Sequence, residues 1–256
     1  LLAATALGIP SPNERFDSRV ARRAAALGGD RQAVPVDLLD TQDGKTHPGY
    51  SSNWAGVALA HPAGTFKAVT ASFSVPAVGA PAGGTGAHAA SAWVGIDGFS
   101  CGSAILQAGL DFIDFGDGDS YYGGWYEWFP GPSRDFTDIS FKPGDEVTVT
   151  VTATSAVTGT AVIHNKSTGE VAAQDVSGPA LCGQNAEWIV EDFVSGGFHV
   201  PLANFGTVTF TNALATTATG LHLGPTDPSA RILDIQLNGS LYTETGIGGS
   251  SVTVRY

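Results

Sequence analysis

The sequence predicts an all-β fold, a β-sandwich built from two antiparallel sheets. Short runs rich in Val and Thr recur along the chain, 34 glycines and 14 prolines separate them, and no long helical pattern interrupts them. Hydrophobic residues make up 43% of the 256 residues and charged residues only 14%, which favours a packed core over disorder. The length is sufficient for one large domain or two small ones.

The individual strands are predicted from alternation and from the turn residues between them. The clearest strand is 147–152, where Val and Thr alternate with the period of two that places apolar side chains on one face. Clusters of Gly, Pro, Asp and Asn delimit the other runs. By these criteria we expect strands at 54–60, 67–75, 92–97, 104–112, 121–129, 146–153, 160–165, 187–193, 207–212, 231–237 and 251–255.

Alternation also predicts which side chains face the core. In the strand that contains Gln107 the even-numbered residues are all apolar, so Gln107 is expected on the opposite face. By the same rule Glu191 shares a face with Ile189, and Glu127 shares a face with Trp125. Polar groups in the middle of aromatic strands are typical of a cleft lining.

The first fifty residues differ from the rest of the chain. Residues 1–8 are apolar and match the end of a signal peptide, which predicts secretion. Residues 9–50 mix Arg, Ala, Asp and Pro, with a short helix expected around 19–26, and we interpret them as a propeptide. The alternative is a plain disordered leader. Residues 51–256 carry the strand patterns and form the predicted domain.

The two cysteines are Cys101 and Cys182. An even pair in a secreted chain favours one disulfide, whereas in a reducing compartment both would be buried thiols.

The net charge of −12 excludes several classes of partner. Residues 1–50 hold equal numbers of basic and acidic side chains, so 51–256 carry the whole charge. Such a surface repels nucleic acid and anionic membranes, and no run approaches the roughly 20 apolar residues of a membrane span. The charge has two explanations: it aids solubility, or the protein works in acid, where carboxylates lose their charge near pH ~4.

A serine-hydrolase motif, Gly-Phe-Ser-Cys-Gly, surrounds Ser100. This motif requires a turn from a strand into a helix. A strand pattern follows at 104–112, so we attribute the match to chance in a glycine-rich chain.

No metal or cofactor is expected. The six histidines are scattered and lack the spacing of zinc ligands. An acidic run, Asp111, Asp114, Asp117 and Asp119, lacks the pattern of an EF-hand loop, which favours a solvated turn over a calcium site.

Paired carboxylates provide an alternative function. Glu127 and Glu191, both on aromatic strands, could serve as acid and nucleophile in a sandwich-fold glycosidase. That hypothesis leaves Gln107 without a role. A non-catalytic, lectin-like module is the third possibility.

Five motifs, in order, resemble those of the glutamic peptidases, or eqolisins. They are Ser-Asn-Trp-Ala-Gly at 52–56, Ala-Trp-Val-Gly-Ile-Asp-Gly at 92–98, Ala-Ile-Leu-Gln-Ala-Gly at 104–109, Trp-Tyr-Glu-Trp-Phe-Pro at 125–130 and Asn-Ala-Glu-Trp-Ile-Val-Glu-Asp-Phe at 185–193. Five motifs in sequence are far more specific than one. Two differences stand out: the chain lacks the C-terminal cysteines of the type members, and 119–124 is longer, so subsite preference is not predicted.

The resemblance implies a concanavalin A-like sandwich of two antiparallel, roughly seven-stranded sheets. It also implies a secreted precursor, a monomer, that cleaves polypeptide substrates in acid. By the matching motifs, the catalytic pair is Gln107 and Glu191 on a concave sheet, and the disulfide is Cys101–Cys182. The positions that match the family's substrate cleft are Trp93, Asp97, Trp125 and Glu127.

The chemistry of the two side chains is consistent with peptide hydrolysis. A Glu191 carboxylate can take a proton from water and return it to the leaving amine. The Gln107 amide can donate to the oxygen that becomes negative and can also hydrogen-bond Glu191. Each residue alone is better explained as a polar side chain at a sheet edge, and only their combination within the motifs favours catalysis.

Overall fold

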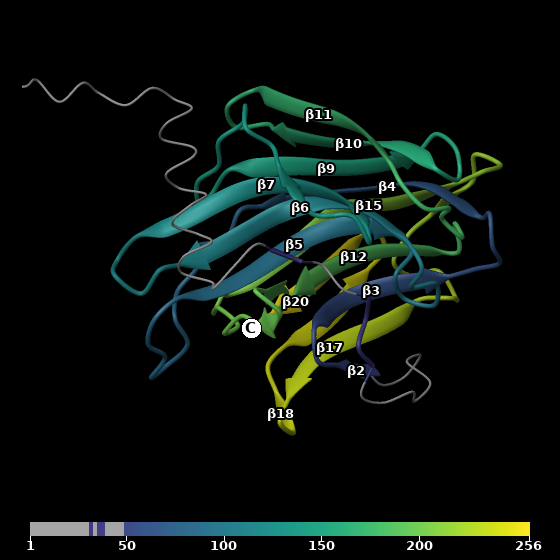
Figure 1. The fold of residues 1–256 in the computed structure, drawn as a ribbon. Coiled ribbons are helices and arrows are strands. Elements are labelled where there is room, and N and C mark those ends of the chain that lie inside the picture. The colour runs from purple at the N-terminus through teal and green to yellow at the C-terminus, as the bar shows by residue number, and fades with distance from the viewer. Residues whose placement is uncertain (1–30, 33–34, 39–48) are drawn as a thin grey trace, which may run out of the picture.

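Two large β-sheets stack face to face in the computed structural model of the protein (Figure 1). The structure describes residues 31–32, 35–38 and 49–256. Every regular element in these ranges is a strand, and they contain no helix long and apolar enough to cross a membrane. The expected signal remnant, the helix around 19–26 and most of 9–50 lie outside the described residues.

The first large sheet has nine strands and carries the predicted site residues except Asp97 and the two cysteines, which lie in adjoining loops. Its order is β18 (Ser240–Leu241), β17 (Arg231–Leu237), β3 (Trp54–Ala60), β12 (Asn185–Glu191), β5 (His88–Ile96), β6 (Ile105–Asp114), β7 (Ser120–Phe129) and β8 (Arg134–Asp135), with β2 (Gly49–Ser51) parallel to β17. The other neighbouring pairs are antiparallel.

The second large sheet has eight strands and covers one face of the first. Its order is β11 (Glu170–Ser177), β10 (Thr158–Asn165), β9 (Glu146–Ala153), β4 (Phe66–Ser74), β15 (Thr207–Thr217), β20 (Ser251–Arg255) and β19 (Glu244–Gly248), with β16 (His222–Leu223) beside β15. A small third sheet joins β1 (Arg31–Gln32), β13 (Val194–Ser195) and β14 (Phe198–His199).

The core lies between the two large sheets and determines which face of each strand is buried there. Phe73 of β4 packs edge-to-face on Phe112 of β6 and Phe210 of β15, with ring centroids 6.4 and 5.4 Å apart. The even-numbered residues of β6, including Leu106 and Leu110, belong to this core. The prediction that Gln107 faces away from the core is therefore confirmed.

The sandwich itself is confirmed, and the strand boundaries differ in informative ways. β3, β9, β17 and β20 have the expected bounds. Short edge strands raise the sheets to nine and eight strands instead of seven. β11 was not predicted because it is a largely exposed edge strand without apolar alternation.

Candidate active site

Gln107 and Glu191 lie on the outer face of the nine-stranded sheet, the face turned away from the sandwich core. Gln107 is on β6 and Glu191 on β12, with β5 between them. On β5, Gly95 lies directly opposite Gln107 and Ser91 opposite Glu191. Both side chains are completely buried in the full chain. The fold thus brings the two predicted catalytic groups to one face, two strands apart.

Trp93 of β5 fills the space between these two groups. Its indole Nε1 donates a hydrogen bond of 2.9 Å to Oε2 of Glu191. The far edge of the same indole lies over Gly95, where a Cβ would sit 2.8 Å from Trp93 Cζ3. Because Gly95 is directly opposite Gln107, one indole ring runs from the carboxylate toward the amide. A side chain at position 95 would displace it.

The amide of Gln107 makes no hydrogen bond within the described part of the chain, although both of its polar atoms are buried. A buried polar group without a partner costs about 1–3 kcal/mol and calls for an explanation. One explanation is functional: the Gln107 amide must be free to bind a substrate near the Glu191 carboxylate. Glu127 of β7 is the residue directly opposite on the other side, and it is 1% exposed.

An aromatic cluster surrounds the pair on the outer face. It consists of Trp54, Trp93, Ile105, Trp125, Ile189 and Leu233, and we call it the outer aromatic cluster. Trp54 meets Trp93 edge-to-face with ring centroids 4.9 Å apart. Trp125 donates from Nε1 to Ser91 Oγ at 3.0 Å, which fixes its ring. The cluster gives the site an apolar floor that contains Trp93 and Trp125, and their assignment to the substrate cleft stays a prediction.

Two further carboxyl groups of the Glu191 segment were not predicted. Glu187 lies on the same face as Glu191 and is completely buried. Burial, with the charge of Asp97, raises the pKa of Glu187 well above its usual range. Asp192 is also buried, and burial together with Glu191 raises its pKa to about 8. The period of two would have placed Glu187 beside Glu191, but its burial depends on neighbouring strands.

Asp97 binds protein backbone. Its backbone has a positive φ of 69°, and its carboxylate accepts N–H bonds of 2.8, 2.9 and 3.2 Å from Gly183, Gln184 and Asn185. Burial raises the pKa of Asp97, and the backbone donors oppose that shift. This carboxylate holds the segment that leads into β12, and its assignment to the substrate cleft stays a prediction.

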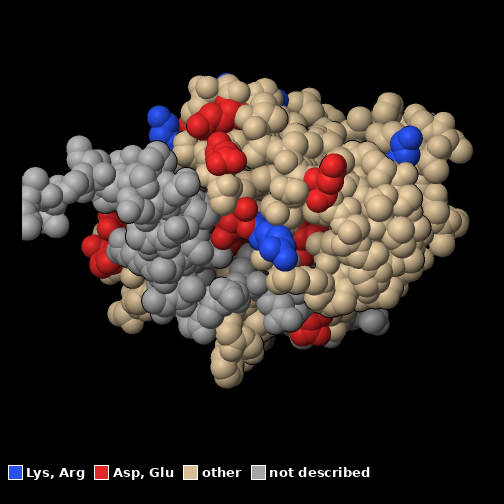
Figure 2. Space-filling model, turned by 45° about the horizontal axis from the view of Figure 1, so that its top comes forward, with Lys and Arg blue, Asp and Glu red and all other residues tan. Residues whose placement is uncertain are grey.

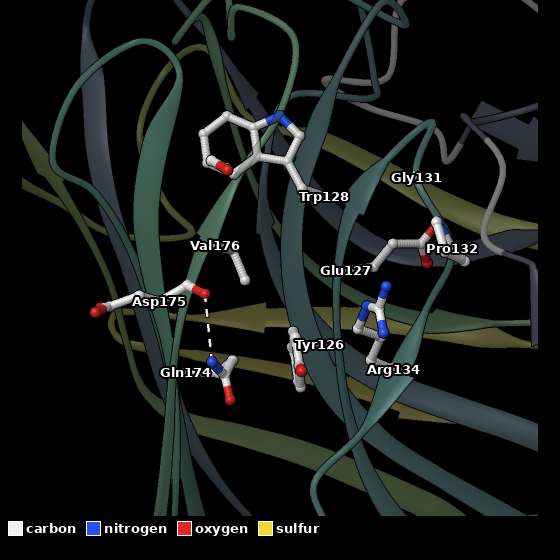
Figure 3. Close-up of a pocket in the computed structure, with 10 residues that line it drawn as sticks. Tyr126, Glu127, Trp128, Gly131, Pro132, Arg134, Gln174, Asp175 and Val176 are labelled. Atoms are coloured by element: carbon white, nitrogen blue, oxygen red, sulfur yellow. Dashed lines mark hydrogen bonds between the residues drawn. The ribbon is translucent and has the colours of Figure 1, made fainter.

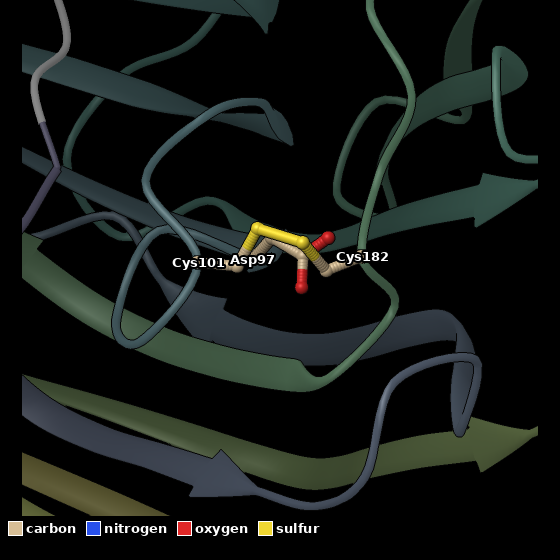
Figure 4. A group of neighbouring side chains, drawn as sticks. All are labelled: Asp97, Cys101 and Cys182. Carbon is tan, nitrogen blue, oxygen red and sulfur yellow. A yellow bond between two sulfur atoms is a disulfide. The ribbon is translucent and has the colours of Figure 1, made fainter.

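The disulfide Cys101–Cys182 is present and lies beside Asp97 (Figure 4). This confirms the predicted pairing and accounts for both cysteines. Asp97 and the two sulfurs form a cluster with the composition of a metal site. Both sulfurs are consumed by the covalent bond, so the cluster offers one carboxylate, already bound to backbone, and we assign no metal to it.

Removing this disulfide should destabilise the protein strongly. The bond joins residues 81 positions apart, and a loop of that size contributes about 4 kcal/mol in the chain-entropy model. The double substitution Cys101→Ser, Cys182→Ser should therefore lower the free energy of unfolding by several kcal/mol in urea titrations. Asp97→Asn in the intact disulfide background measures the backbone contacts separately. An unchanged midpoint in the double variant would contradict this.

A groove of about 420 Å³ opens at the edge of the sandwich, between the β7–β8 connection and β11. Tyr126, Trp128 and Arg134 form one wall and Gln174 and Val176 the other (Figure 3). Glu127 reaches the groove from the outer face, pointing toward Pro132 and Arg134 in Figure 3.

The motifs that were set aside have local explanations. Ser100 lies in a loop before a strand, and its Oγ donates to Asn185 Oδ1 at 3.1 Å. In the acidic run, Asp114 and Asp117 each accept a backbone N–H two residues ahead, from Gly116 and Asp119. These are side-chain turns of a hairpin.

The face in Figure 2 shows several scattered carboxylates and few basic groups, in line with the net charge of −12.

Comparison with known proteins identifies the class. Residues 52–256 match the model of the Peptidase A4 family. The chain is 42% identical to aspergillopepsin-2 of Aspergillus niger over 100% of this chain and 96% of the relative, and 36% identical to scytalidopepsin B of Scytalidium lignicola over 94% and 90%. A scytalido-glutamic peptidase structure with a transition state analog inhibitor superposes with a TM-score of 0.71 at 37% identity, covering 80% of this chain and 98% of the other.

The fold and these relatives thus define a peptidase of the glutamic class. The structure of aspergilloglutamic peptidase from Aspergillus niger agrees, with 50% identity, a TM-score of 0.63 and coverage of 66% of this chain and 99% of the other. The chain belongs to the Peptidase A4 family, the eqolisins, and is an endopeptidase of that family. The glycosidase and lectin alternatives are not favoured.

Proposed function

We propose that the protein is a secreted, acid-acting endopeptidase that hydrolyses peptide bonds with Gln107 and Glu191. The observation that carries the proposal is the difference in hydrogen bonding between the two side chains. Glu191 is oriented by the Trp93 indole, and the Gln107 amide is buried without a partner among the described residues. An oriented carboxylate and an uncommitted amide donor are the two groups that acyl transfer to water requires.

In the proposed reaction, the Glu191 carboxylate removes a proton from water as the water attacks the scissile carbonyl carbon. The Nε2 hydrogens of Gln107 donate to the carbonyl oxygen as it becomes negative. The protonated Glu191 then gives its proton to the leaving amine, which restores the carboxylate. The Trp93 indole N–H donates to Oε2 of Glu191 at 2.9 Å and orients the carboxylate for this step.

Digestion of casein or haemoglobin tests this function directly. We expect protein cleavage in acid that pepstatin does not inhibit, because this pair is not a dyad of aspartates. Cleavage should fall steeply toward neutral pH. Full activity at pH 7, complete inhibition by pepstatin, or glycan hydrolysis without proteolysis would each contradict the proposal.

We further propose that residues 9–50 act as an inhibitory propeptide. In support, Gln107 and Glu191 are completely buried in the full chain, and Val36, within this segment, packs on the outer aromatic cluster. A buried dyad cannot receive a polypeptide, so removal of the segment up to residue 48, which leaves β2 (Gly49–Ser51) in the sheet, should raise activity at least tenfold. Equal activity of the chain with and without the segment, measured on one substrate, would count against a zymogen.

A further inference from the structure

We infer that Asn53 is a substrate-binding residue that holds the main chain of an extended peptide beside the catalytic pair. The inference rests on the proposed function and extends it to a named contact. The observation behind it is that Asn53 already holds such a peptide, the segment 35–37 of its own chain.

The amide of Asn53 binds the segment in two directions. Its Nδ2 donates to the carbonyl oxygen of Pro35 at 3.2 Å, and its Oδ1 accepts the backbone N–H of Asp37 at 2.9 Å. A side-chain amide that pairs with a C=O and the N–H two residues later forms a two-point contact to an extended main chain. The partners also determine the orientation of the amide, because a carbonyl cannot donate and an N–H cannot accept.

Two backbone groups, of Gly98 and of Ser52, complete the contact. The N–H of Val36 donates to the carbonyl of Gly98 at 3.3 Å, and the N–H of Ser52 donates to the carbonyl of Asp37 at 3.0 Å. Three consecutive residues are therefore held by four hydrogen bonds to their main-chain atoms. Recognition of this kind is independent of sequence, as an endopeptidase requires for diverse substrates.

Asn53 is anchored in a fixed position relative to the catalytic pair. It is completely buried, and Ser51 Oγ donates to its Oδ1 at 2.8 Å. Its own carbonyl accepts the N–H of Asp192, and the next residue, Trp54, pairs in register with Glu191. The Asn53 amide is therefore fixed next to Trp54, the residue that pairs with Glu191. This preorganisation lowers the entropy cost of binding a peptide.

The side chain of Val36 adds a second element. It packs against the outer aromatic cluster while its N–H is bound to Gly98. The peptide held by Asn53 thus presents an aliphatic side chain to the apolar floor of the site. We expect a substrate bound in the same way to bind more tightly when it has an aliphatic residue at the position of Val36. The main chain of the substrate would supply the hydrogen bonds.

Peptide binding without catalysis tests the inference. A full-length chain with a protease site in place of residues 43–47 is folded, nicked, and separated from its leader, all in a Glu191→Gln background. Two labelled octapeptides serve as probes: one with the sequence of residues 31–38, and one of unrelated sequence but similar mean hydropathy. Fluorescence anisotropy gives both dissociation constants.

We expect Asn53→Ala to weaken both octapeptides by about tenfold or more, because two hydrogen bonds are lost. Asn204→Ala is the matched control. It removes the same side chain at an exposed position before β15, where Oδ1 accepts the N–H of Gly206 at 2.9 Å, so its loss should change affinity less than about twofold. Where Asn53→Ala fails to fold, Asn53→Asp at pH 6 keeps the size but lacks the Nδ2 donor, and should weaken binding likewise.

Two results would overturn the inference. If Asn53→Ala weakens only the 31–38 peptide, the residue is an anchor for the leader and not for substrates. If neither peptide is affected, the contact contributes nothing. The proposed function is tested separately, by protein cleavage with the chain that retains Glu191. If that chain cleaves no protein but both peptides still bind in an Asn53-dependent way, the role of Asn53 is supported and the peptidase mechanism is contradicted.

Discussion

In the chain freed of the segment up to residue 48, Glu191→Gln is expected to lower kcat for casein in acid by about a thousandfold or more. The substitution preserves the size of the side chain and its ability to accept the Trp93 indole N–H, but it removes the base that activates water. Gln107→Ala removes a donor to the developing oxyanion and should cost about a hundredfold to a thousandfold. KM should change little in either variant.

The double variant makes this prediction sharper. When two residues act in one step, removing the second costs little once the first is gone, so the double variant should be about as active as Glu191→Gln alone. Glu244→Gln, an exposed carboxylate on the second large sheet, is the matched control and should retain wild-type activity. A Glu191→Gln variant with more than about a tenth of the wild-type kcat would be incompatible with the proposed mechanism.

The sequence predicted the face on which the proposed catalytic residues lie more reliably than it predicted their surroundings. Even-numbered apolar residues in β6 were enough to place Gln107 away from the core, because alternation is a local property. The pairing of β12, β5 and β6 is not local, and the Trp93 indole between Glu191 and Gln107 follows only from that register.

Contacts between distant segments set the limit of prediction. Asn53 was part of a recognised motif, but its partners Pro35 and Asp37 come from the leader, which has no strand pattern. β11 was not predicted because it, too, depends on a contact with another segment. It is an edge strand with a mostly exposed pattern, so pairing with β10 defines it rather than its own hydrophobicity.

The buried carboxyl groups next to Glu191 offer a physical origin for the proposed activity in acid, which the chemistry of a simple base does not explain. A base such as Glu191 would work better as the pH rises. Asp192 and Glu187 behave differently, because burial raises the pKa of each in the folded state. Deprotonation of Asp192 or Glu187 either leaves a buried negative charge near Glu191 or requires local unfolding that exposes the carboxylate to water.

The stability of the protein is therefore expected to fall as the pH rises from about 4 to about 8. The folded Asp192 carboxyl has a pKa of about 8, whereas an unfolded one titrates near ~3.9. Between these values the folded state binds the additional proton, so its stability is complete below about pH 4 and is lost as the pH rises. One such group contributes a slope of at most about 1.4 kcal/mol per pH unit.

Asp192→Asn should remove that contribution. In urea titrations at pH 4, 5, 6 and 7, the free energy of unfolding of the variant should fall less steeply than that of the wild type, and the variant should be the more stable protein at pH 7. Asp234→Asn is the matched comparison. Burial raises the pKa of Asp234 to about 6, so this variant should differ in slope only below about pH 6. Parallel curves for Asp192→Asn and wild type across the range would show that the pH dependence of stability does not come from Asp192. A flattened curve would assign that pH dependence to Asp192, the residue that directly follows Glu191.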